Sequence, residues 1–330
     1  MAAPYAAPWW LPGGHLQTIW PALQGRRKQF SVAYTRARWN TPDQDFIDVD
    51  WLVDAGQSTG ASHPRRPLLV LFHGLEGTSQ SHYARAFAAH AQRIGWRFAV
   101  PHFRGCSGEI NRAPRAYHSG DFEEIEWILK RLRREHEGPL FAVGVSLGGN
   151  ALLRWAEESG ASASQLANAI AAVCSPIDLT ACGLALGRGL NRLIYTPMFL
   201  DTMKPKALKK WDQHPGLFSK TKLQGARTLY EFDDVFTAPL HGYKNADDYW
   251  RRASAMPHLQ AIRTPTLIVH ARNDPFVPAQ SLPIASDMTS YVTLLQTLGG
   301  GHVGYASANP RKNMEWLPRA LAGWLSGHLT

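Results

Sequence analysis

The chain has 330 residues, 45% of them apolar and 18% charged, which is the composition of a globular protein with a sizeable core. No apolar run comes near the roughly 20 residues that a membrane-spanning helix needs, which excludes an integral helical membrane protein. The first residues, MAAPYAAPWWLPGG, lack the basic and smoothly apolar regions of a secretory signal, so we expect a cytoplasmic protein.

Basic residues outnumber acidic ones by 35 to 26, which gives a net charge of +9. Such a balance suits nucleic acid or an anionic lipid surface. No nucleic-acid-binding motif accompanies it, so we expect no nucleic acid partner. Solvated helix faces are the favoured interpretation of the basic clusters, and peripheral membrane contact stays open. The sequence does not indicate an oligomeric state.

Three cysteines, Cys106, Cys174 and Cys182, give no even disulfide framework. We expect them to be reduced and partly buried small residues, as in a cytoplasmic protein. A cysteine nucleophile is the alternative, and it is disfavoured because none of the three lies in a catalytic signature.

Strand and helix patterns alternate along the chain after a Gly-, Ser- and Pro-rich loop at 54–67. Short apolar runs predict strands at 68–72, 97–100, 140–143, 169–174, 266–270 and 291–296. Helical periodicity predicts helices at 81–94, 121–136, 150–158 and about 313–326. Buried strands that alternate with amphipathic helices indicate a mainly parallel sheet covered on both faces.

This alternation stops between about residues 177 and 259, where Lys, Pro and aromatic residues are frequent. We predict a single domain over 1–330, with a core at about 26–176 and 260–330, an N-terminal segment at 1–25 and a mostly helical insertion at 177–259. The insertion is either a lid over a site or an excursion without function. We favour the lid, because loops at the carboxyl ends of strands bind ligands in such folds.

The motif G-x-S-x-G occupies 144–148, with Ser146 at its centre. A serine nucleophile needs a sharp, strained strand-to-helix turn, and side chains two residues to either side would collide there. Gly144 and Gly148 remove that collision. The bare pattern is common in sequences, and an ordinary glycine-rich turn is the alternative. An apolar strand before the motif and a helix after it favour the nucleophile.

An acyl-transfer serine also needs donors for the oxyanion. The first would be the backbone N–H of Leu147, directly after the nucleophile. The second should lie in the glycine-rich loop after the strand at 68–72, and we assign it to the N–H of Leu75. His73, in the same loop, is expected to brace it and not to act as the base.

The base and the acid should follow the serine in the chain. His302, in GGGH just after the last predicted strand, is the best of the fourteen histidines. Asp274 follows the strand at 266–270 and is the favoured acid. Asp178, four residues beyond the strand at 169–174, is its competitor. The order Ser146, Asp274, His302 matches that of the α/β-hydrolase fold.

Several long stretches extend this match from residue 8 to residue 305: PWWLPGGHLQTIWPAL, LFHGLEGTSQSHY, FRGCSGEINRAPRAYHSGD, GVSLGGNALLRW, EFDDVFTAPLHGY, ARNDPFVP and GGGHVGY. Through them the chain resembles the YheT-like group of α/β-hydrolases, which is related to the plant EMB8-type proteins. The resemblance implies esterase chemistry on short or medium acyl esters, with eukaryotic relatives acting on acylglycerols, phospholipids or ethyl esters. It also supports Ser146, Asp274 and His302 as the triad. Asp121, where relatives often have Thr, is a departure that leaves the triad untouched.

No metal or nucleotide motif is present, so we expect no cofactor and no metal. The predicted activity is hydrolysis of carboxylic esters through an acyl-enzyme on Ser146. Acyl transfer to an alcohol by the same triad is one alternative, and a non-catalytic interaction protein is another. A small-molecule or lipid ester is the expected substrate.

Apolar residues between 184 and 199 could roof a short acyl slot, which predicts an optimum at about four to ten carbons. They are Leu184, Leu186, Leu190, Leu193, Ile194, Tyr195, Met198 and Phe199. Trp9, Trp10 and Trp20 could contact lipid or wall the pocket, although burial against the core is the favoured interpretation.

Overall fold

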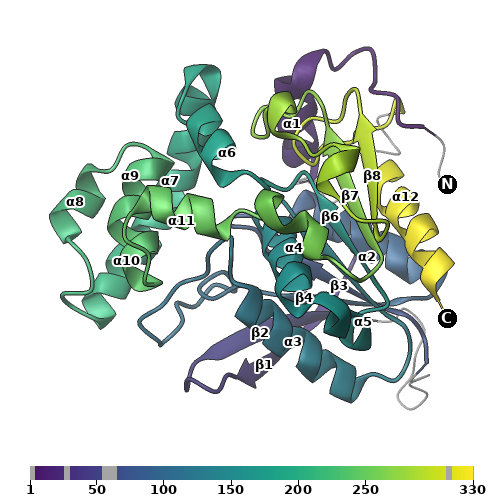
Figure 1. The fold of residues 1–330 in the computed structure, drawn as a ribbon, viewed down its shortest axis with the longest axis horizontal. Coiled ribbons are helices and arrows are strands. Elements are labelled where there is room, and N and C mark those ends of the chain that lie inside the picture. The colour runs from purple at the N-terminus through teal and green to yellow at the C-terminus, as the bar shows by residue number, and fades with distance from the viewer. Residues whose placement is uncertain (1–3, 26–29, 54–64, 310–313, 330) are drawn as a thin grey trace.

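The computed structural model describes residues 4–25, 30–53, 65–309 and 314–329 (Figure 1). Its strands are β1 Tyr34–Asn40, β2 Phe46–Leu52, β3 Leu68–Phe72, β4 Arg97–Pro101, β5 Leu140–Val145, β6 Ala169–Val173, β7 Thr266–Ala271 and β8 Val292–Thr297. Within these ranges they form one eight-stranded sheet in the order β1-β2-β4-β3-β5-β6-β7-β8. The pairs β1/β2 and β2/β4 are antiparallel, and the remaining pairs are parallel.

The six predicted strands are confirmed to within two residues, as β3 to β8. The hairpin of β1 and β2 was not predicted, because charged residues interrupt its apolar pattern. Arg36 pairs with Asp50 at 2.7 Å and Arg38 with Asp48 at 2.8 Å across the two strands. Most of the predicted loop at 54–67 lies outside the described residues.

Helices cover both faces of the sheet. On one face lie α3 (Phe122–Glu135), α4 (Leu147–Ser159) and α5 (Ala163–Leu166); on the other lie α2 (His82–Ile94) and α12 (Trp316–Leu325), with α1 (Gly13–Gly25) against α2. The strand β3 shows how the sequence divides between the faces. Leu68, Val70 and Phe72 enter the core on the α4 side, and Leu69 and Leu71 the core on the α2 side, because successive strand residues point to opposite faces.

The predicted helices correspond to α2, α3, α4 and α12. The structure begins α4 at Leu147, three residues before the predicted start. The predicted start of the last helix, Asn313, lies outside the described residues. The helix α1 was not predicted.

The chain between β6 and β7 is helical and lies beside the sheet (Figure 1). It contains α6 Leu179–Leu186, α7 Gly189–Gln213, α8 Lys220–Gly225, α9 Leu229–Phe232, α10 Ala238–Leu240 and α11 Ala246–Ala253, with a π-helical turn at Asp233–Thr237 and a 3-10 turn at Met256–Ala261. This helical insertion has an apolar cluster separate from those beside the sheet, which includes Leu200, Phe218, Leu223 and Phe232. Nowhere in the described ranges does a helix combine the length and apolar character that crossing a membrane requires.

Candidate active site

Ser146 lies at the junction of β5 and α4, with φ 54° and ψ −122°. A Cβ atom at Gly144 would lie 2.4 Å from the carbonyl oxygen of Gly148. A Cβ atom at Gly148 would lie 2.5 Å from the carbonyl oxygens of Phe72 and His73. The turn that exposes the serine hydroxyl therefore requires glycine at both positions.

The structure brings Ser146, His302 and Asp274 together. His302 Nε2 lies 3.0 Å from Ser146 Oγ, and His302 Nδ1 lies 2.9 Å from Asp274 Oδ2. The Asp274 side chain is fully buried, and its other oxygen accepts the N–H of Phe276 at 2.8 Å. Asp178, the competing acid, instead caps α6 by accepting the N–H of Ala181 at 2.9 Å.

The N-terminal helix α1 holds the loops that carry Asp274 and His302. Gln17 Oε1 accepts the N–H of Gly300 at 2.7 Å and Asn273 Nδ2–H at 3.0 Å. Thr18 Oγ1 accepts the N–H of His302 itself at 2.8 Å. The predicted acid and base are therefore positioned from a segment more than 250 residues away.

The sequence-based prediction gave α1 no part in the site. The only signal was the stretch PWWLPGGHLQTIWPAL, which resembles the YheT-like proteins but indicated no contact with the site. The contact is close enough to explain Gly14, because a Cβ atom there would lie 1.8 Å from the carbonyl oxygen of Asn273. A Cβ atom at Gly304 would likewise lie 1.8 Å from the carbonyl oxygen of Gln17.

The N–H of Leu75 has no acceptor among the described residues, whereas both neighbouring amides have one. Gly74 N–H donates to the hydroxyl of Tyr83 at 2.9 Å, and Glu76 N–H donates to the hydroxyl of Tyr117 at 2.9 Å. Two tyrosines thus hold the loop on either side of Leu75 and leave its N–H available. These tyrosines were also missed, because no pattern in the sequence assigns their hydroxyls to the amides of this loop.

The N–H of Leu147 is the first amide of α4, and it too has no acceptor among the described residues. Amides at a helix N-terminus lack an internal partner and carry the positive end of the helix dipole.

His73 braces the loop that carries Leu75. Its Nδ1–H donates to Gly74 O at 2.8 Å, and its Nε2 accepts Phe103 N–H at 3.1 Å. Burial lowers the pKa of His73 to about 3.

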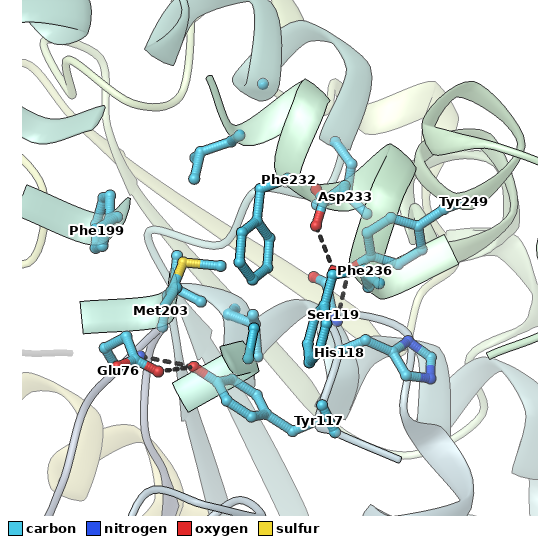
Figure 2. A pocket seen from close by; sticks show the side chains of 18 of the residues that line it. Glu76, Tyr117, His118, Ser119, Phe199, Met203, Phe232, Asp233, Phe236 and Tyr249 are labelled. Atoms are coloured by element: carbon cyan, nitrogen blue, oxygen red, sulfur yellow. Dashed lines mark hydrogen bonds between the residues drawn. The ribbon is translucent and has the colours of Figure 1, made fainter. Parts of the chain in front are cut away.

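Ser146 and His302 open into a cavity of about 150 Å³, with Leu75 and Leu147 on its wall. Most of the apolar wall comes from the insertion, through Leu179, Leu186, Phe199, Met203, Phe232 and Phe236. Figure 2 shows Met203 and Phe232 of the insertion above Glu76 and Tyr117 of the core. Core and insertion therefore enclose the space together.

The predicted roof is partly wrong. Of the eight apolar residues expected there, only Leu186 and Phe199 line the cavity. Leu190 and Leu193 point away from it and are 57% and 73% exposed. Periodicity alone could not assign faces here, because α7 carries apolar residues on more than one side.

Polar groups also reach the cavity from the insertion. Lys206 Nζ of α7 lies 2.8 Å from the Glu76 carboxylate, which joins the insertion to the Leu75 loop. Asp233 is half-buried in the π-helical turn, where it accepts Trp250 Nε1–H at 2.8 Å and the Thr237 hydroxyl at 2.6 Å. Burial raises the pKa of Asp233 to about 6.

All three cysteines are free and buried. Cys174, Asp274 and His302 are the one group in the described ranges whose donor atoms, all within 4.8 Å of one another, could hold a metal ion. Burial raises the pKa of the Cys174 thiol, which disfavours the thiolate that a metal binds. A metal there would also compete with the His302–Asp274 hydrogen bond.

The prediction for the three tryptophans is wrong in part. Trp9 is 89% exposed, and Trp10 and Trp20 are half-buried against each other with ring centroids 4.7 Å apart. None of the three lines the cavity.

Most of the chain is similar to known proteins. The family model described as alpha/beta hydrolase fold matches residues 67–308. The Escherichia coli protein named "Putative esterase YheT" is 40% identical over 318 residues, which is 96% of this chain and 91% of that protein. Phospholipase ABHD3 of the mouse is 30% identical over 280 residues, covering 83% of this chain and 67% of its own.

Among solved structures, the esterase Pf2001 of Pyrococcus furiosus superposes with a TM-score of 0.56 at 14% identity. The superposition covers 100% of this chain and 98% of that one. At this identity the likeness concerns the fold. The predicted fold and the predicted resemblance to YheT are both confirmed.

Proposed function

The chain belongs to the α/β-hydrolase fold family and, within it, to the YheT-like group, and from this premise we propose that it is a serine hydrolase of carboxylic esters. One observation carries the proposal: Ser146 Oγ, His302 and Asp274 are joined by hydrogen bonds of 3.0 and 2.9 Å beside two unpaired backbone N–H groups. A nucleophile, its base, an orienting acid and oxyanion donors are the parts that acyl transfer needs.

In the proposed reaction, the Ser146 hydroxyl attacks the ester carbonyl carbon while His302 Nε2 takes its proton. The negative charge that develops on the carbonyl oxygen is stabilised by the N–H groups of Leu75 and Leu147. When the tetrahedral intermediate collapses, the C–O bond to the alcohol breaks and His302 returns the proton to the leaving alcohol. A water molecule then repeats the sequence on the acyl-enzyme and releases the acid.

Asp274 keeps His302 in the required tautomer. Its oxygen accepts from Nδ1–H, so Nε2 carries the lone pair that receives the serine proton. The same carboxylate stabilises the imidazolium during the reaction. Its buried position and the N–H of Phe276 fix its orientation.

The substrate class follows from the cavity wall. Phe199, Phe232 and Phe236 give an acyl chain an apolar surface, which supports esters of short or medium acyl chains and lipid esters among them. The cavity volume is about 150 Å³. An apolar cavity of about this size in another protein binds benzene, a ring of about six carbons, so the volume suits a short or medium acyl chain. The names of the relatives, esterase and phospholipase, agree with this class. In this proposal residues 177–259 form the lid.

Labelling with a fluorophosphonate tests the proposal, because the reagent reacts only with an activated serine. We expect labelling of the wild type and of Ser162→Ala, whose serine is exposed and outside the cavity, and none of Ser146→Ala. Labelling that survives Ser146→Ala, or no labelling of the wild type, would refute it. Product analysis with a p-nitrophenyl ester in water and in added alcohol separates hydrolysis from acyl transfer.

A further inference from the structure

One segment of the insertion exposes a concentrated apolar surface. Leu184, Leu190, Leu193, Ile194 and Met198 have exposed fractions between 41% and 73%, and we call them the α6–α7 apolar face. The described ranges expose fifteen large apolar side chains, and these five lie together between residues 184 and 198. Single exposed apolar residues are normal, whereas such a cluster marks an interaction surface.

The same two helices are apolar toward the cavity as well. On α6, Leu179 and Leu186 line the cavity and Leu184 points outward. On α7, Phe199 and Met203 line the cavity, whereas the exposed residues precede them. A helix that is apolar on both sides is normally covered on both. Here the core covers one side only.

Buried side chains anchor the face to the rest of the protein. Tyr195 and Thr196 are buried in the middle of it, and the Thr196 hydroxyl donates to the carbonyl of Leu186 at 2.7 Å. The His15 ring of α1 stacks on Tyr195 with ring centroids 5.8 Å apart. In Figure 1, α6 and the start of α7 project beyond the sheet on the side of α1. Their outer surface is therefore presented to a partner without any rearrangement.

The charged side chains within this face are positive, and the exposed acid Asp201 follows it on α7. Arg188 and Arg192 are exposed and are the only charged side chains between residues 179 and 200. The whole chain carries a net charge of +9. Apolar side chains with nearby arginines match the boundary of an anionic bilayer, where apolar groups enter the acyl region and cations meet the headgroups.

We propose that the α6–α7 apolar face docks this protein on an anionic phospholipid bilayer. The bilayer and the cavity then lie on opposite sides of the same helices, about 10 Å apart, which is the diameter of one helix. The docking does not depend on the proposed ester hydrolysis. It would place the cavity next to a source of acyl chains.

Co-sedimentation with vesicles tests the proposal in a Ser146→Ala background, so that no lipid is consumed and the result is independent of the chemistry. Vesicles of equal parts phosphatidylcholine and phosphatidylglycerol should bind the protein, and phosphatidylcholine alone should bind it more weakly. Leu190→Ser combined with Leu193→Ser should weaken binding about hundredfold, since each buried leucine contributes about tenfold or more. Arg188→Ala with Arg192→Ala should weaken binding to the anionic vesicles about fivefold per arginine.

Ile284→Ser is the matched control, because Ile284 is 62% exposed but lies outside the face. It should bind like the parent, and all variants should keep the parental melting temperature. Undiminished sedimentation of the double leucine variant would overturn the proposal. So would a dimer in light scattering that the same two substitutions dissociate, because the face would then be an interface between two copies.

Discussion

The side-chain oxygen of Gln17 lies 3.0 Å from Asn273 Nδ2, although the two residues are 256 positions apart. The same oxygen accepts the N–H of Gly300 at 2.7 Å. Asn273 directly precedes Asp274, and Gly300 lies two residues before His302. Because Gln17 is only 4% exposed, water would not easily replace it. One buried amide therefore sets the spacing of the loops that carry the proposed acid and base.

We expect Gln17→Ala to lower kcat for p-nitrophenyl butyrate by about 10- to 100-fold with little change in KM, since small misplacement of catalytic groups has effects of this order. Gln17→Glu retains an acceptor oxygen and should recover most of kcat. Gln24→Ala, on the same helix, is the control. Melting temperatures measured alongside separate a local effect from unfolding. An unchanged kcat in Gln17→Ala would show that the loops hold their spacing without it.

The contribution of α1 could not be predicted from the sequence, and the reason is physical. The strands β3 to β8 and the helices α2, α3, α4 and α12 follow from patterns of burial that each segment carries by itself. The contact of Gln17 with Asn273 depends on two distant segments, and a single glutamine has no pattern. The hairpin β1–β2 was missed for a related reason, since the partners of its charged residues lie on the other strand.

The residues proposed to react were predictable because chemistry restricts their surroundings. Ser146 needs the glycines of a strained turn, and His302 and Asp274 need places after strands at one edge of the sheet. The residues that hold them are less restricted. Any buried hydroxyl could have satisfied the amide of Gly74, so nothing marked Tyr83 for this role in advance.

The tyrosines around Leu75 provide a test of the proposed oxyanion loop. Tyr83→Phe and Tyr117→Phe each release an amide next to Leu75, and we expect kcat to fall about tenfold or more, since loss of an oxyanion donor itself costs about 10²- to 10³-fold. KM should change little. Tyr291→Phe, at an exposed tyrosine, is the matched control. If both variants keep wild-type kcat, the second donor lies elsewhere than on this loop.

The acid is tested by two matched substitutions. Asp274→Asn should lower kcat by several orders of magnitude, about 10⁴-fold in the template case, because the amide favours the wrong histidine tautomer. Asp178→Asn should have little effect, since asparagine also caps helices and Asp178 caps α6. Steady-state rates of both purified variants decide the matter. The reverse order of effects would make Asp178 the acid.

Acyl-chain preference should follow the cavity wall. Each methylene buried there contributes about 0.8 kcal/mol, or about fourfold in kcat/KM, until the slot ends. A series of p-nitrophenyl esters should give a maximum at about four to ten carbons. Phe199→Trp fills part of the slot and should move that maximum to shorter chains, whereas Ile284→Trp should not. A preference for acetyl esters, or for long-chain emulsions, would contradict this assignment.

Acid sensitivity follows from a histidine that the proposed chemistry does not use. His270 of β7 is fully buried, and neither of its ring nitrogens has a hydrogen-bond partner in the described part of the chain. Burial lowers its pKa from 6.5 to about 4. The unfolded chain therefore takes up the proton first as the pH falls. Stability that is complete above pH 6.5 is lost between pH 6.5 and 4, by about 1.4 kcal/mol per pH unit and about 3 kcal/mol in total.

Urea unfolding at pH 7 and pH 5 measures this loss. The wild type should lose about 2 kcal/mol more unfolding free energy between these values than His270→Leu, because the variant lacks the titrating group. Other buried histidines, such as His73, will still give the variant a slope of its own. His258→Leu, at an exposed histidine, should keep the wild-type difference. The wild type and His270→Leu could instead lose equal unfolding free energy between pH 7 and pH 5. His270 would then be protonated to the same extent in the folded and unfolded chains. Its strand would open to water more readily than its burial indicates.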